Sequence, residues 1–295
     1  MMYLISYILL YPVIILLSRL PFWVIYRISD VLYFFTYYII RYRKKIVFSN
    51  LKLVFPDKSK QELTTIAKAF YLHFGDMLME SVKAFSMSNE DMLKRYHYKN
   101  PEIFQELFNK KKGVALMGSH YANWEWIVHV SQFAPHKSYG TYNQLKNPYF
   151  DKLIRKSRGK FGGQLLTSAE TIPTVKYNKE NGLLGLYGLV SDQSPMLHKT
   201  HYWRPFMGVK VPVHTGAEAI AKKYDLAVVF FNVEKIKRGF YEVTFELISD
   251  DASNLKNFEI TDKYLTLVEN QIKRKPAFYF WTHKRWKHKD KASLN

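Results

Sequence analysis

Two apolar stretches open the chain. Residues 1–17 are interrupted only by Ser6 and Pro12, and a second stretch over residues 22–40 carries one arginine and one aspartate. The first is near the minimum length for a membrane span, roughly 17 residues. Its start, MMYLISY, lacks the charge of a signal peptide and no A-x-A-like cleavage site follows, so we expect a retained membrane anchor. The second stretch, because of its charges, is expected to lie in the membrane interface or to pack against the fold.

A basic run, RYRKK at residues 41–45, comes directly after the apolar region. Positive charge beside an anchor marks the cytoplasmic side of a membrane and attracts anionic headgroups. An ordinary solvated helix face would show the same run. We predict a membrane anchor and interfacial helix in residues 1–45, facing the cytoplasm.

Beyond residue 45 the spacing of apolar positions alternates between helical and strand-like. Helices are expected at residues 60–85, 124–133, 215–223 and 265–273, and strands at 114–117, 183–190, 226–233 and 241–247. Strands that alternate with helices predict an α/β fold, with a mostly parallel central sheet flanked by helices. We find no internal repeat and no low-complexity linker, so a single catalytic domain is expected over residues 46–295.

Composition narrows the range of partners. Lys and Arg total 44 against 25 Asp and Glu, a formal charge of +19, which attracts anionic lipid, nucleic acid or an acidic protein. The sequence has no zinc-finger spacing, RNP-type strand or G-x-x-G loop, so we expect no nucleic-acid partner. Aromatic residues make up 17%, which suits a lipid headgroup boundary, although an aromatic-rich core gives the same count. The absence of cysteine excludes disulfides, thiolate zinc sites and a cysteine nucleophile.

The segment GVALMGSHYANWEW, residues 113–126, carries the candidate chemistry. His120 and Glu125 are five positions apart, which on one straight helix separates them by about 140°. They can meet only if His120 lies in a turn and Glu125 in the first helical turn. Gly118 and Ser119 allow such a bend, and Asn123 is a plausible N-cap.

A histidine beside a carboxylate can activate an alcohol. The imidazole takes the hydroxyl proton in the transition state, because its pKa lies near neutral pH. A carboxylate on the other ring nitrogen fixes the tautomer and stabilises the imidazolium. The nucleophile then belongs to the substrate, and no serine or cysteine nucleophile is required. On its own the H-x-x-x-x-E spacing is weak, since a structural histidine and core packing of the N-W-E-W run are alternatives.

Several further elements follow in a recognisable order. They are residues 50–56 (NLKLVFP), 118–125 (GSHYANWE), 147–158 with Asn147, Pro148, Asp151 and Arg158, 191–193 (SDQ) followed by 206–208 (FMG), and 276–286 (PAFYFWTHKRW). Together they resemble the lipid A late-acyltransferase family of lauroyl/myristoyl type, within the lysophospholipid acyltransferase superfamily and its H-x4-D/E motif. The resemblance covers nearly the whole chain. The departures are Ser119, Tyr121 and Ala122 within the histidine motif, and Lys284 in place of an arginine.

The resemblance implies roles for individual residues. His120 deprotonates the accepting hydroxyl and Glu125 orients it. The residues expected to contact substrate are Asn123, Arg158, Asp192, His283 and Arg285. Arg158 is a candidate for the oxyanion of the tetrahedral intermediate or for a substrate phosphate, with a surface arginine as the alternative.

The other implied roles are less defined. Asp192 follows an apolar strand and could position an arginine or a sugar hydroxyl, or only cap a turn. His283 and Arg285 lie in an aromatic and cationic segment that could recognise acidic headgroups or a carrier, or be a solvated tail. His198 and His201 have no third ligand, so no metal site is expected.

The resemblance also implies a fold and an activity. We expect a glycerol-3-phosphate acyltransferase-like domain at the cytoplasmic face of the inner membrane, without a cofactor. The expected reaction moves a fatty acyl chain from acyl carrier protein, or from acyl-CoA, to a hydroxyl of a lipid A precursor. The alternatives are another lipid acceptor (a lysophospholipid, an aminolipid or a glycolipid such as a phosphoinositol mannoside) and a non-catalytic membrane lipid-binding protein or scaffold.

Overall fold

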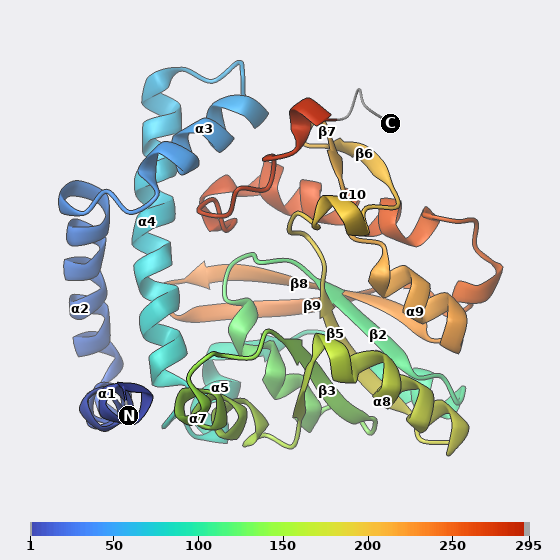
Figure 1. Ribbon diagram of the computed structural model, residues 1–295. Coiled ribbons are helices and arrows are strands. Elements are labelled where there is room, and N and C mark those ends of the chain that lie inside the picture. Colours follow the sequence, from blue (N-terminus) through green and yellow to red (C-terminus); the bar gives the residue numbers. More distant parts are fainter. Residues whose placement is uncertain (1, 292–295) are drawn as a thin grey trace.

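A seven-stranded sheet forms the centre of the molecule (Figure 1), in a computed structural model that describes residues 2–291. Its strands are β1 (Tyr96–Tyr98), β2 (Val114–Gly118), β3 (Lys137–Tyr142), β4 (Gln164–Thr167), β5 (Gly185–Val190), β8 (Ala227–Lys237) and β9 (Phe240–Ser249). The order across the sheet is β1-β9-β8-β2-β5-β3-β4. Strands β8, β2, β5, β3 and β4 are parallel, whereas β9 is antiparallel to β8. The predicted α/β fold with a mostly parallel sheet is confirmed.

The central strand β2 lies between β5 and β8 and is covered on both faces. All of its residues are buried, as expected for a parallel strand with helices on both sides. Helix α8 (Ser168–Glu180) packs on β3 and β4, while α9 (Gly216–Tyr224) and α10 (Glu259–Arg274) pack on β2 and on each other. A two-stranded antiparallel ribbon, β6 (Trp203–Phe206) with β7 (Val209–Pro212), stands apart from the main sheet.

The remaining helices of residues 2–291 complete the layers around the sheet. They are α1 (Met2–Arg19), α2 (Phe22–Phe34), η1 (Phe35–Ile39), α3 (Lys44–Val54), α4 (Lys60–Lys83), α5 (Asn89–Arg95), α6 (Ile103–Asn109), η2 (Trp124–Gln132), α7 (Pro148–Gly159), η3 (Leu197–Lys199), η4 (Ala252–Asn254), η5 (Pro276–Phe278) and η6 (Lys289–Lys291). Helix α4 begins with a capping box in which Ser59 and Glu62 bond each other's backbone N–H groups, so its predicted start has a local physical cause. The helix expected at residues 124–133 forms, but as the tighter 3-10 helix η2.

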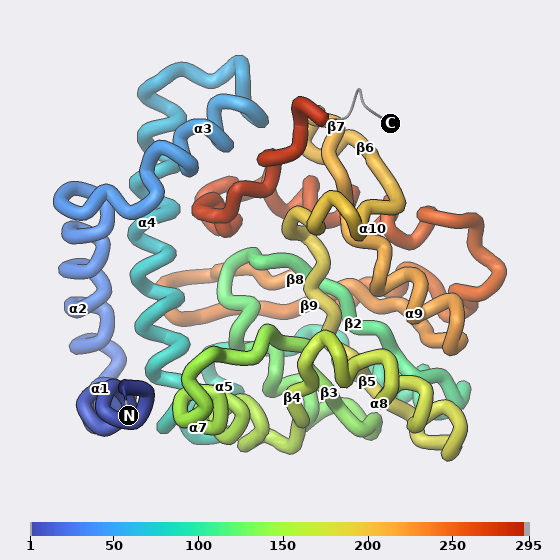
Figure 2. Tube along the Cα trace, in the orientation of Figure 1, coloured from blue at the N-terminus to red at the C-terminus, as the bar shows by residue number. Residues whose placement is uncertain are grey.

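The two N-terminal apolar stretches behave differently. Helix α1 is long and apolar enough to cross a membrane by length and composition, with a mean hydropathy of 1.8 and only 6% of the segment buried. Helix α2 packs along α4 and buries Ile25 and Ser29, which is one of the two arrangements expected for the second stretch; its place in a membrane interface stays a prediction. Figure 2 shows α1 end-on, beside the lower ends of α2 and α4. Its residue Tyr7 packs against Tyr149 with tilted rings and against Phe150 edge-to-face, both on α7.

The end of β2 tolerates no side chain at Gly118. A Cβ atom there would lie 2.1 Å from the ring of Phe231, which is itself buried. We expect Gly118→Ala to lower the free energy of unfolding by about 1–3 kcal/mol, because an overpacked core forces strand or ring to shift. Chemical denaturation measures the loss. Gly216→Ala, at a position where nothing lies within 4 Å, is the matched control, and an equal loss in both variants would contradict the packing argument.

Candidate active site

The carboxyl ends of β2 and β5 lie side by side, and the residues beyond them form a hydrogen-bonded pair. The two strands are parallel neighbours with Gly118 opposite Val190, and His120 and Asp192 each follow two residues later. Nδ1 of His120 lies 2.6 Å from Oδ1 of Asp192. The backbone N–H of His120 donates to Oδ2 of the same carboxylate at 3.2 Å. Strand register therefore unites two residues that are 72 positions apart.

The contact with Asp192 decides which ring nitrogen of His120 is available. A carboxylate on Nδ1 holds the proton there and leaves Nε2 as the free base. The Asp192 side chain is fully buried, whereas the His120 side chain is 23% exposed. Within residues 2–291 no protein group bonds Nε2. The ring centroids of Trp124 and Phe280 lie 5.2 and 6.1 Å from that of the imidazole, so two aromatic side chains lie beside His120.

The electrostatics of the pair favour proton uptake by the imidazole. Burial lowers the pKa of His120, but the charge and hydrogen bond of Asp192, with a smaller contribution from Glu125, raise it above 6.5. Burial acts to raise the pKa of Asp192, and the charge and hydrogen bonds of His120 bring it below 3.8. The carboxylate therefore stays ionised near neutral pH, where it stabilises the imidazolium that forms when His120 takes a proton.

The turn that carries His120 is held by the C-terminal segment. The His120 carbonyl accepts from the backbone N–H of Phe280 at 3.1 Å, and the Ala122 N–H donates to the Phe278 carbonyl at 2.9 Å. Ala122 has a φ of 50°, in the left-handed region that side-chain-bearing residues seldom adopt. Such a conformation persists only where neighbours fix it, and these two backbone bonds contribute to that.

Glu125 is not the partner of the His120 ring, in contrast to the expectation from the sequence. The Glu125 carboxylate pairs with the guanidinium of Arg158 on α7, and Nδ1 of His120 is occupied by Asp192. The reason is local geometry: Glu125 lies on the 3-10 helix η2, whose first turn directs it toward α7. Both members of the Glu125–Arg158 pair are partly exposed, at 24% and 29%, and Glu125 is near enough to raise the pKa of His120.

Asn123 begins η2 as expected but lies away from solvent. Its side-chain oxygen accepts from the backbone N–H of Trp126 at 3.2 Å, which confirms the predicted N-cap. Its Nδ2 donates to Oε2 of Glu80 at 2.7 Å, and the residue is fully buried. Both ends of its amide are thus occupied within the protein, and contact of Asn123 with substrate stays an untested prediction.

Arg285 and His283 lie around the buried side of the pair. Arg285 is only 1% exposed. It donates to the Pro212 carbonyl and stacks over the ring of Phe206 at 4.9 Å. Burial lowers the pKa of Arg285, and Asp192 is among the groups that oppose this. Burial likewise lowers the pKa of His283, to about 4, so its ring is neutral near pH 7. Arg285 is thus not part of a solvated tail, and its contact with a headgroup or a carrier stays a prediction.

Two residues that form hydrogen bonds at this edge of the sheet, Gln271 and Tyr264, were not predicted from the sequence. Ser119 donates to Oε1 of Gln271 at 2.7 Å, and the hydroxyl of Tyr264 donates to the Gly118 carbonyl at 2.7 Å. Both partners come from α10. The only signal in the sequence was the helical spacing of α10, which says nothing about where its polar residues point.

A carboxylate-held histidine with one open ring nitrogen, at the carboxyl edge of a parallel sheet, is an arrangement suited to general acid–base catalysis. Comparison with known families shows the class of enzyme. The chain belongs to the bacterial lipid A biosynthesis acyltransferase family, whose profile matches residues 2–288. It is therefore an acyltransferase, and the family resemblance found in the sequence is confirmed.

Two curated proteins illustrate the relationship. The lipid A biosynthesis lauroyltransferase of Escherichia coli (strain K12) is 25% identical over 275 residues, which cover 92% of this chain and 88% of that protein. The lipid A biosynthesis acyltransferase 2 of Shigella flexneri is 25% identical over 148 residues, or 50% of this chain and 46% of that protein. The first similarity extends over almost the full length of both chains.

Proposed function

We propose that this enzyme transfers a fatty acyl chain from acyl carrier protein to a hydroxyl of a lipid A precursor, with His120 as general base and Asp192 as its orienting carboxylate. The observation that carries the proposal is the 2.6 Å contact between Nδ1 of His120 and Asp192, which leaves Nε2 free in a chain of this family. The lipid A acceptor follows the family and the printed activity of the Escherichia coli relative.

The proposed chemistry moves one proton twice. Nε2 of His120 takes the proton of the acceptor hydroxyl as its oxygen attacks the thioester carbonyl, and the carbonyl becomes a tetrahedral oxyanion. When this collapses, the carbon–sulfur bond breaks and the leaving thiolate takes the proton back from the imidazolium. The products are an ester and a free thiol. Ionised Asp192 stabilises the imidazolium between the two transfers.

Glu125 has a different part in this proposal from the one expected. Its carboxylate holds the Arg158 guanidinium at a partly exposed position. A guanidinium fixed on one side by a carboxylate keeps donors on its other side for an oxyanion or a phosphate. We assign Arg158 to one of these two charges and Glu125 to its orientation.

The acceptor is expected to be anionic and to approach from the membrane. A hollow of about 750 Å³ lies between Tyr3 of α1 and the 144–155 region, and cationic side chains line part of it, namely Lys146, Lys152 and Arg155. Cations beside an apolar helix suit a phosphorylated lipid. We propose that α1 anchors the enzyme at the cytoplasmic face of the inner membrane, with residues 46–295 as the catalytic domain.

The test is a transfer assay with detergent-solubilised protein, comparing labelled acyl carrier protein and acyl-CoA as donors and a tetraacylated lipid A precursor and a lysophospholipid as acceptors. We expect the highest kcat/KM with the carrier protein and the lipid A precursor. Salt should lower the rate with the carrier more than with acyl-CoA, because an acidic protein is steered by the +19 charge over a wide surface.

Each part of the proposal can fail separately in this assay. A preference for acyl-CoA would overturn the donor, and a preference for lysophospholipid would overturn the acceptor. If folded wild-type protein transfers nothing in any combination, the enzyme proposal itself is wrong and a lipid-binding or scaffold role replaces it.

A further inference from the structure

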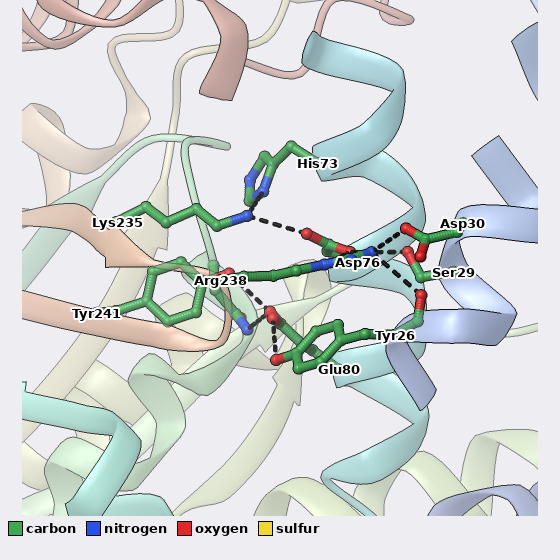
Figure 3. Close-up of polar contacts among 10 residues, drawn as sticks. Tyr26, Ser29, Asp30, His73, Asp76, Glu80, Lys235, Arg238 and Tyr241 are labelled. Atoms are coloured by element: carbon green, nitrogen blue, oxygen red, sulfur yellow. Dashed lines mark hydrogen bonds and ion pairs between the residues drawn. The ribbon is translucent and has the colours of Figure 1, made fainter. Parts of the chain in front are cut away.

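One face of α4 carries a buried row of polar side chains that the proposed reaction does not use directly. His73, Asp76 and Glu80 are spaced by three and four residues, so they share a helix face, and they are 4%, 1% and 0% exposed. Figure 3 shows this row between α2 on one side and the β8–β9 hairpin on the other.

Asp76 forms ion pairs with two basic residues of the β8–β9 hairpin and a hydrogen bond with α2. Lys235 donates to Oδ2 of Asp76 at 3.0 Å, and Arg238 reaches Oδ1 of Asp76 at 2.6 Å and Oδ1 of Asp30 on α2 at 2.6 Å. Ser29 of α2 also donates to Oδ1 of Asp76, at 2.8 Å. The attachment of α2 to the fold is thus already secured by ionic contacts at Asp76.

Glu80 faces the catalytic turn and has a different set of partners. Oε2 of Glu80 accepts from Nδ2 of Asn123 at 2.7 Å and from the hydroxyl of Tyr241 at 2.8 Å. Oε1 accepts from the hydroxyl of Tyr26 on α2 at 3.0 Å. The Glu80 backbone carbonyl accepts from Nε1 of Trp126 at 3.3 Å. Within residues 2–291, no cationic nitrogen lies within salt-bridge distance of this carboxylate.

The bond from Glu80 to Asn123 acts at a strained position. Asn123 follows Ala122, whose φ is 50°, and is three residues from His120. A left-handed non-glycine residue needs neighbours that over-determine it. On one side the turn is bonded to the C-terminal segment, and on the other the Asn123 amide fastens it to Glu80.

We propose that Glu80 is a positioning residue for acyl transfer: through Asn123 its carboxylate fixes the turn that presents His120, and through Tyr26 it joins that turn to α2, the helix next to the membrane anchor. This inference rests on the proposed role of His120. It assigns to Glu80 a part in the reaction although Glu80 touches neither substrate nor reacting atoms.

Burying a carboxylate at the position of Glu80 costs desolvation free energy, which suggests that its negative charge has a role. Three uncharged donors satisfy it, and a neutral group could fill the same space without the desolvation cost. Burial raises the pKa of Glu80 to about 7, with Asp76 acting in the same direction and Lys235 and the two tyrosine hydroxyls opposing it. Groups that face it come from every element packed around it, namely Tyr26 of α2, Asp76 of α4, Asn123 of the turn, Lys235 of β8 and Tyr241 of β9.

The negative charge of Glu80 strengthens its hydrogen bond to Asn123, which holds the turn that carries His120. A hydrogen bond to an ionised acceptor is roughly twice as strong as a neutral one, so protonation of Glu80 loosens Asn123 and should lower the rate of transfer, as protonation of His120 also does. Below neutral pH, kcat should therefore depend on two protons in the wild type. With Glu80→Gln, only the proton on His120 remains.

The experiment measures kcat, KM and their pH dependence for transfer by wild type, Glu80→Gln and Ser29→Ala in full-length protein. For Glu80→Gln we expect kcat to fall by about tenfold, as for a displaced catalytic group, with KM little changed. The acid limb of log kcat should be steeper than one in the wild type, where protonation of Glu80 adds its roughly tenfold loss, and should have a slope of one in Glu80→Gln. Ser29→Ala removes a buried bond of the same network at Asp76 and should keep both kcat and slope.

The outcomes separate the two proposals. Wild-type transfer with unchanged kcat and slope in Glu80→Gln overturns the positioning role alone, as does an equal loss in Ser29→Ala. Absence of wild-type transfer overturns the proposed function and this inference with it. If Glu80→Gln does not fold, Tyr241→Phe removes one donor from Glu80, and the acid limb should move to higher pH; an unmoved limb contradicts the inference.

Discussion

The His120→Ala variant is expected to lose acyl transfer by about 10²- to 10⁴-fold in kcat, the range that a positioned general base contributes. The acceptor hydroxyl then has no group to take its proton as the carbon–oxygen bond forms. Binding of donor and acceptor should change little, because the contacts expected for them lie on other residues. The measurement is kcat and KM in the detergent assay, with circular dichroism to verify folding.

The matched control for this prediction is His198→Ala. His198 is exposed on η3, and its replacement should leave kcat unchanged. Retention of more than about a tenth of wild-type kcat in folded His120→Ala would contradict the general-base role, whatever the control shows.

The Asp192→Asn variant is expected to have the second largest effect, up to about 10⁴-fold in kcat, because an amide can hold the imidazole in the wrong tautomer. It also predicts a change in pH dependence with a definite sign. In the wild type Asp192 raises the pKa of His120 above 6.5 against the effect of burial, so kcat/KM should rise with pH through a value above 6.5. Without that charge, burial dominates and the acid limb should move to lower pH.

Glu125→Gln is the comparison that distinguishes the two carboxylates. Glu125 makes the smaller contribution to the pKa of His120, and its bonded partner is Arg158. Its replacement should move the acid limb less than Asp192→Asn does. If Glu125→Gln shifts the limb more, and Asp192→Asn leaves it in place, the orienting role belongs to Glu125.

The sequence predicted the parts of the fold that depend on local spacing. Apolar runs located β2, β5 and β8, and helical spacing located α4, α9 and α10. The edge strand β4 was not predicted, because it is short and three of its positions are not fully buried. The 3-10 form of η2 was also missed, since the apolar spacing of this segment is compatible with either helix type.

The candidate site shows a similar division. His120 could be found from its position after a buried strand and a glycine, which are both local features. The hydrogen bond between His120 and Asp192 could not be predicted, because this contact depends on the order of strands in the sheet and on the register of β2 with β5. The burial of Arg285 was likewise hidden, since a basic C-terminal segment normally remains solvated and here packs against Phe206.

The bond between His120 and Asp192 also affects when the protein becomes active during its own synthesis on the ribosome. Closing a contact across 72 residues is slow compared with forming local helices, since chain entropy must be lost before the pairing is rewarded. Phe280, which bonds the His120 carbonyl, leaves the ribosome later still. With α1 as the anchor proposed above, we expect a nascent chain to reach the bilayer before His120 and Asp192 have met. Acyl transfer should begin only after Phe280 has emerged, so the growing polypeptide is expected to be inactive before that point.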